Sequence, residues 1–255
     1  MRRFAFLLIA ALLAACTVPD GSAPSSAGQA DVKRRTDIRL ELATAYYTSG
    51  QADIALQELH RALELSPRRA DVLGLRGLVL MQLGDSEAAG QSLRNALRLE
   101  PDNPSLQNNM GWFLCHKGEF DKAMPYFERA LSTKSYASPE KALVNAGLCR
   151  MRQGQGVQAE AFLRRALDND PTNLQAHAGL ARLAFDRADY PRARSHLLKV
   201  IESEQAVAEN FLMAILIERK RGDAASEQSL LAQWRRRFPE SPQLTAYLRG
   251  ETDDK

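Results

Sequence analysis

A repeat with a period of about 34 residues constrains the fold of this 255-residue chain more than any other feature. Glycines and prolines recur at that interval or at about twice it, and alanines follow the first four glycines by about a dozen residues. Three residue types that keep one phase through most of the chain predict a stack of similar units. The glycines are Gly50, Gly84, Gly118, Gly154 and Gly222, the prolines are Pro67, Pro101, Pro171 and Pro239, and the alanines are Ala62, Ala96, Ala130 and Ala166.

Each unit is predicted to hold two helices joined at the glycine, because Gly can adopt the left-handed conformation that ends a helix. Ala lets two helix backbones approach closely, and Pro stops the second helix. This arrangement resembles the tetratricopeptide repeat (TPR), which implies an all-α superhelical array. We expect a TPR domain over residues 34–250 that ends in a capping helix between Ser241 and Arg249. Its units are expected at residues 36–69, 70–103, 104–137, 140–173, 174–207 and 208–241.

Small residues are expected where helices pack closely, and one larger apolar residue is expected in each second helix. The small residues are Ala43, Gly77, Gly111, Gly147 and Ala181 in the first helices and Ala55, Ala89, Ala123, Ala159 and Ala193 in the second, and the larger ones are Leu59, Leu93, Phe127, Leu163, Leu197 and Leu231.

Departures from the pattern are also informative. Ser138-Pro139 adds two residues between the third and fourth units, which predicts a local irregularity in the superhelix. Unit five has Ala188 in place of its turn glycine, and unit six has Glu227 in place of a small residue. Unit six therefore fits the repeat least well.

The N-terminus has the pattern of a bacterial lipoprotein signal peptide. Met1-Arg2-Arg3 is basic, and the apolar run from Phe4 to Ala15 is too short to span a membrane but fits a signal-peptide core. It ends in Leu13-Ala14-Ala15-Cys16, which resembles the lipobox, in which the Cys is diacylated. The alternative is an ordinary signal peptide with a chance cysteine.

We therefore expect residues 1–15 to be cleaved and Cys16 to be lipidated. Residues 16–33, rich in Pro, Gly, Ser and Ala at their start, are expected to form a flexible tether. Thr17 stands where Gram-negative lipoproteins retained in the inner membrane usually have Asp. The resemblance thus implies a lipid anchor in the outer membrane, on its periplasmic face.

Composition and motifs argue against catalysis and nucleic-acid binding. The net charge of +3 gives no support for a nucleic-acid footprint. The stretch Gly154 to Ala159 matches a relaxed dinucleotide pattern, but a helix is expected before it where that motif needs a strand. The four histidines lack metal-ligand spacing. We expect no catalytic residues, no metal, no cofactor and no small-molecule substrate.

The first helices of TPR units line a concave groove, so their groove-facing positions are candidate partner-binding residues. The row is mostly apolar, with Trp112 at its middle, and would suit an amphipathic or extended partner segment. The alternative is that these side chains pack between neighbouring first helices. The carboxylate clamp of one TPR subclass is absent, because Gly74 and Leu78 occupy its basic and Asn positions. The candidates are Thr44, Tyr47, Leu78, Met81, Asn108, Trp112, Leu148, Met151, Arg182 and Phe185.

Cys115 and Cys149 form a candidate disulfide. Both lie in the first helices of adjacent units, which pack side by side, and the expected periplasmic location is oxidising. The alternative is two buried free cysteines that act as small hydrophobic residues. The bond would link units three and four across the two-residue insertion.

The middle of the chain carries a narrower resemblance. Asn108-Asn109-Met110-Gly111-Trp112-Phe113-Leu114-Cys115, Tyr126-Phe127, Tyr136-Ala137-Ser138-Pro139 and Asn145-Ala146-Gly147-Leu148-Cys149 resemble the type IV pilus biogenesis lipoprotein family PilW/PilF. The resemblance implies a non-enzymatic pilotin that helps the pilus secretin to reach the outer membrane, multimerise or remain stable. Its expected partner is the secretin or another pilus-assembly protein. The alternative is an outer-membrane TPR scaffold for peptidoglycan synthesis or outer-membrane protein assembly.

Overall fold

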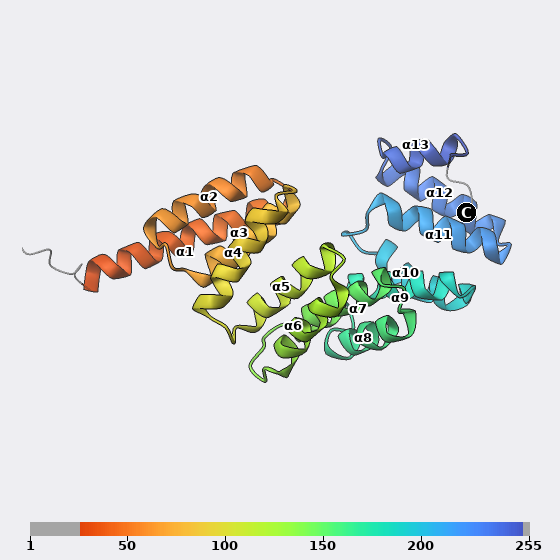
Figure 1. Ribbon diagram of the computed structural model, residues 1–255. Helices are drawn as coiled ribbons and strands as arrows, with labels where there is room; N and C mark the ends of the chain where they lie inside the picture. The colour runs from red at the N-terminus through yellow and green to blue at the C-terminus, as the bar shows by residue number, and fades with distance from the viewer. Residues whose placement is uncertain (1–25, 252–255) are drawn as a thin grey trace, which may run out of the picture.

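The computed structural model describes residues 26–251, and every regular element in that range is a helix (Figure 1). The expected all-α fold is therefore confirmed. Successive helices run antiparallel in pairs and form a curved array from α1 to α13 (Figure 1). The helices are α1 Ser26–Thr48, α2 Ala52–Leu65, α3 Ala70–Gln82, α4 Ser86–Leu99, α5 Pro104–His116, α6 Phe120–Ser132, α7 Pro139–Arg152, α8 Gly156–Asn169, α9 Leu174–Asp186, α10 Tyr190–Ile201, α11 Ala208–Arg221, α12 Ala224–Arg237 and α13 Pro242–Leu248.

Six helix pairs, from α1–α2 to α11–α12, occupy the expected units. From α3 to α11, each odd-numbered helix packs against its own partner and against the second helix of the preceding pair. The odd-numbered helices from α1 to α9 also contact one another in sequence, so they form one continuous layer.

The first helix is longer than expected. Because α1 begins at Ser26, residues 26–33 are helical and do not belong to a tether. Ion pairs at helical spacing support this extension: Arg34 lies 2.8 Å from Asp31, and Lys33 lies 2.7 Å from Asp37. The signal peptide and Cys16 lie outside the described residues. No helix within residues 26–251 is both long and apolar enough to cross a membrane.

The turn glycines behave as expected. Gly50, Gly84, Gly118, Gly154 and Gly222 all have φ between 75° and 82°, which is the left-handed conformation. Ala188 takes the place of this glycine in unit five and keeps the same conformation, with φ 58°. The turn is therefore retained at the cost of a strained alanine backbone.

The cores form where small and large residues meet. The larger apolar residues of units one to five are at most 1% exposed: Leu59, Leu93, Phe127, Leu163 and Leu197. Gly111 illustrates the close fit, because a Cβ there would lie 2.7 Å from the Phe127 ring. In unit six the expectation is wrong. Leu231 is only half-buried, and Leu230 is buried in its place.

The C-terminal end is closed by aromatic residues. Trp234 is fully buried, and its ring centroid lies 5.7 Å from that of Tyr247 on α13. Glu227 accepts a hydrogen bond from the Tyr247 hydroxyl, 3.1 Å away. Large and polar residues thus replace the small ones of other units, which explains the shifted burial. The predicted capping helix is confirmed as α13.

Candidate partner-binding groove

A hollow of about 560 Å³ crosses the layer of odd-numbered helices. It runs from the end of α1 across α3, α5 and α7 to the start of α9. Fourteen residues line it: Tyr47, Thr48, Leu78, Ser105, Asn108, Asn109, Trp112, Tyr136, Ser138, Lys141, Val144, Asn145, Asn173 and Gln175.

The lining of this groove combines amide and aromatic side chains with almost no formal charge. Lys141 is the one residue of the fourteen with an ionised side chain at neutral pH. Burial raises the pKa of Tyr47 above its ordinary value. Burial, with a contribution from the Glu140 charge, raises the pKa of Tyr136 to about 12. Both tyrosine hydroxyls therefore remain protonated and can donate hydrogen bonds to a bound group.

Trp112 lies near the middle of the groove on α5. Its side chain is half-buried, and its ring makes an edge contact with His116, at 4.2 Å between centroids. The His116 Nδ1 atom lies 3.0 Å from the Trp112 carbonyl oxygen one turn earlier. The indole is thus supported on one side and still accessible. An accessible and positioned tryptophan in a concave surface is a typical binding anchor.

An amide pair links the two central helices of the groove. The Asn145 side chain on α7 donates a hydrogen bond from Nδ2 to Oδ1 of Asn108 on α5, over 3.0 Å. Asn108 is only 7% exposed. The pair fixes these two helices relative to each other at the groove floor.

The predicted groove residues separate into three sets. Tyr47, Leu78, Asn108 and Trp112 come together in the groove. Met81, Leu148, Met151 and Phe185 are partly buried against the hydrophobic clusters between helices, as the packing alternative predicted. Thr44 and Arg182 are exposed, and Arg182 pairs with Asp186 at 2.8 Å. These six residues do not line the groove.

Sequence reasoning missed most of the polar lining. Ser105, Asn109, Lys141, Asn145 and Gln175 lie at the second or sixth position of their units. These positions precede the ninth by seven or three residues and therefore share its helix face. Extending the row from Trp112 toward the helix N-terminus would have found them. Tyr136 and Ser138 come from the α6–α7 connection, which contains the insertion.

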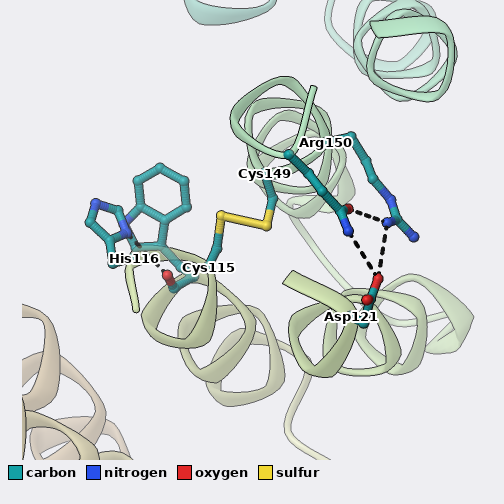
Figure 2. The surroundings of a disulfide bond; sticks show 7 residues. Cys115, His116, Asp121, Cys149 and Arg150 are labelled. Carbon is teal, nitrogen blue, oxygen red and sulfur yellow. Dashed lines mark hydrogen bonds and ion pairs between the residues drawn. A yellow bond between two sulfur atoms is a disulfide. The ribbon is translucent and has the colours of Figure 1, made fainter. Parts of the chain in front are cut away.

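The two cysteines of the described chain are joined. A disulfide connects Cys115 of α5 to Cys149 of α7, with Cα atoms 5.7 Å apart (Figure 2). His116 lies on one side of the bond, and Arg150 and Asp121 lie on the other (Figure 2). Arg150 approaches Asp121 of α6 to 3.6 Å. The bond therefore fastens together the two helices that carry the Asn108–Asn145 pair.

A second polar cluster lies between α8, α9 and α10. His177 and His196 approach to 2.9 Å between their Nδ1 atoms, and His177 Nε2 lies 3.1 Å from the Pro171 carbonyl oxygen. Burial lowers the pKa of both imidazoles. In the described part of the chain no three His, Cys, Asp or Glu side chains gather as metal ligands would.

Comparison with known proteins defines the class first. The tetratricopeptide repeat family matches residues 40–104, 75–140, 117–173 and 150–211, which is more than half of the chain. The chain is therefore a tetratricopeptide-repeat protein. A crystal structure of PilW, described as a widely conserved type IV pilus biogenesis factor, is similar with a TM-score of 0.71 and 30% identity, over 84% of this chain and 98% of that one. The chain belongs to the PilW/PilF family of type IV pilus biogenesis proteins.

Two further similarities agree with this family. The type IV pilus assembly protein PilF of Pseudomonas aeruginosa is 22% identical over 205 residues, which is 80% of this chain and 81% of PilF. A solved structure of Pseudomonas aeruginosa pilF has the same fold, with a TM-score of 0.68 at 21% identity over 86% of this chain and 99% of that one.

Proposed function

We propose that this chain is a non-catalytic outer-membrane lipoprotein, a pilotin, that promotes localisation, multimerisation or stability of the type IV pilus secretin. It does so by binding a segment of its partner in the groove. The observation that carries the proposal is the Trp112-centred groove in a chain of the PilW/PilF family. A protein that binds the assembled or assembly-competent state of its partner favours that state by mass action, and needs no catalysis.

The lipid on Cys16 supplies the membrane address in this proposal. Helix α1 begins at Ser26, ten residues after Cys16. Ten residues span at most roughly 35 Å when fully extended. The folded array would therefore work close to the inner surface of the outer membrane, where the secretin is inserted.

Deletion of the gene tests the biological role. The deletion should abolish surface pili and heat-stable secretin multimers and leave cell shape intact. The wild-type gene and a Val157→Ala control should restore both, because Val157 is 78% exposed on the outer helix α8. Trp112→Ala should restore neither, although the protein accumulates. Normal piliation in the deletion strain would contradict the proposal. An altered cell shape with normal pili would favour a scaffold for the cell envelope.

Two measurements test the anchor and the partner. Cys16→Ser should abolish labelling with a fatty acid and release the protein from the outer-membrane fraction. Affinity purification of the mature lipoprotein should recover the secretin, and Trp112→Ala should reduce its recovery at least tenfold. Equal recovery by both variants would show that the groove is not the binding surface.

A further inference from the structure

The amide pair at the centre of the groove has unused hydrogen-bonding capacity. Asn108 Oδ1 accepts the bond from Asn145 Nδ2. Among residues 26–251 no hydrogen bond engages the other two atoms, the Nδ2 donor of Asn108 and the Oδ1 acceptor of Asn145. Asn108 is more than nine-tenths buried, and both residues line the hollow. One donor and one acceptor are thus presented side by side to whatever occupies the groove.

This pattern matches a peptide main chain. Each residue other than proline offers one C=O acceptor and one N–H donor, which a side-chain amide can engage together. The groove also has further amides without internal partners in the described range, on Asn109 of α5 and Gln175 of α9. Amides repeat along the groove from α5 to α9, and a bound main chain would meet one at each helix.

The length of the hollow favours an extended occupant. Neighbouring packed helices lie about 8–10 Å apart, so the path from α3 to α9 measures roughly 25–30 Å. An extended chain advances about 3.3 Å per residue, and about eight residues would fill that path. A short oligosaccharide, which would also bind amide and aromatic side chains, would occupy only one part of that path.

The charge of the groove lining limits which side chains a bound segment can carry. Lys141 is the only charged group that lines the groove, and no acidic side chain is among the lining residues. A Lys or Arg of the bound segment would be desolvated there without a counter-charge, whereas an Asp or Glu could pair with Lys141. The segment is therefore uncharged or acidic.

We propose that the groove binds an extended peptide of about eight residues, whose main chain pairs with Asn108 and Asn145 and whose side chains are polar or acidic, with an apolar residue against Trp112. This inference rests on the proposed function, because both take a protein segment as the occupant of the groove. It adds the chemistry of that segment. Recognition through the main chain tolerates many sequences, so the groove selects by conformation and charge more than by sequence.

The first test uses a random library of 12-residue peptides displayed on phage, selected on the full-length mature protein. Selected peptides are then synthesised and titrated by calorimetry. They should be poor in Lys and Arg, and N-methylation of one central peptide bond should weaken binding about tenfold, since it removes one main-chain hydrogen bond. Failure to select any peptide that binds below a Kd of about 1 mM, or indifference to N-methylation at every position, would overturn the inference.

The second test uses matched variants. Asn108→Asp keeps an acceptor for Asn145 and replaces the free donor with an oxygen, so it should weaken peptide binding at least tenfold while the fold is retained. Asn145→Ala should act in the same direction. Asn169→Ala is the control, because Asn169 is exposed at the end of α8, outside the groove. Unchanged peptide affinity in Asn145→Ala and Asn108→Asp would contradict the inference, and so would tighter binding of chito-oligosaccharides than of any peptide.

The two proposals fail separately. Loss of pili in the deletion strain together with no peptide binding would leave the pilus role standing and remove the extended-peptide groove. Peptide binding that depends on Asn108, together with normal pili in the deletion strain, would do the reverse.

Discussion

Units four and six keep one sequence register but fill it differently. In unit four, Gly147 and Ala159 lie where α7 and α8 cross, and Leu163 is fully buried beside them. Ala166 later in α8 is also fully buried. Small residues at these positions let the two helices of a unit pack closely. They also let the first helix of the following unit approach.

Unit six has large or polar residues at the same positions. Ile215 and Glu227 stand where unit four has Gly147 and Ala159, and Trp234 stands in place of Ala166. Trp234 fills the space that a further unit would otherwise occupy, and α13 covers it. The difference teaches that one substitution pattern extends the array and the other ends it.

Removal of the Trp234 side chain should have the largest effect. Trp234→Ala restores the repeat alanine, but α13 rather than a helix pair packs against that position in residues 26–251, so a cavity would remain and the free energy of unfolding should fall by about 3–5 kcal/mol. Urea unfolding measures the loss, and limited proteolysis should cut first near α13. Arg236→Ala, which is exposed on the same helix, serves as control. A loss below about 1 kcal/mol would contradict the role of Trp234 in closing the array.

The disulfide should matter almost as much. The cysteines are 34 residues apart, and loop closure of that length corresponds to about 3–4 kcal/mol in the entropic account. The Cys115→Ala, Cys149→Ala double variant should lose that stability under oxidising conditions and match the wild type under reducing ones. Mass measurement with and without alkylation checks the bond itself. Two alkylated thiols in protein isolated without reductant would refute it.

The same truncation in units four and six should give different losses. Leu163→Ala removes a fully buried side chain and should cost about 2–5 kcal/mol, whereas Leu231→Ala removes a half-buried one and should cost about 1 kcal/mol or less. Urea midpoints of the two variants provide the comparison. Equal losses of stability would contradict the half-buried state of Leu231, which occupies the position of Leu163 in unit six.

The histidine pair should make stability depend on pH. Because the pKa of His177 is lowered by burial, the unfolded chain binds more protons below pH 6.5, and stability should decrease as pH falls through that value. Unit three has Gln107 at the position of His177, bonded to the Pro101 carbonyl as His177 is to that of Pro171. His177→Gln should therefore flatten the decrease between pH 6.5 and 5. An unchanged slope would exclude this pair as its cause.

Relief of the strained turn should have the smallest effect. Ala188→Gly gives unit five the residue that the other units use at positive φ and should raise stability by about 0.5–1 kcal/mol. A shift of the thermal midpoint by a few degrees would show it. Gly154→Ala in unit four should shift the midpoint in the opposite direction.

Much of the fold could be predicted from the sequence because it depends on local signals. Glycines with positive φ mark the turns, and small residues mark close packing, so unit boundaries and α13 follow from spacing. The start of α1 does not, because the residues before Asp31 have the composition of a linker. There the ion pairs of Lys33 and Arg34 are a weak signal, each worth a few tenths of a kcal/mol.

The groove could be predicted only in part. Tyr47 and Trp112 follow from the twelfth and ninth positions of their units, but a rule by position treats every unit as equally exposed. Met151 and Phe185, at the same position as Tyr47, instead pack against the hydrophobic clusters between helices. The Asn108–Asn145 contact needs two helices at a known distance, which a single sequence does not supply.

The disulfide also has a mechanical consequence. A chain anchored at one end and bound to a moving assembly would carry tension along its length, and helical repeats lengthen under load by peeling apart. The covalent bridge removes the segment between Cys115 and Cys149 from the load path, so roughly 115 Å of contour length cannot be drawn out. The bridged segment, which carries Tyr136, Lys141 and Asn145 of the groove lining, would thus be shielded from forces that unravel the repeats on either side.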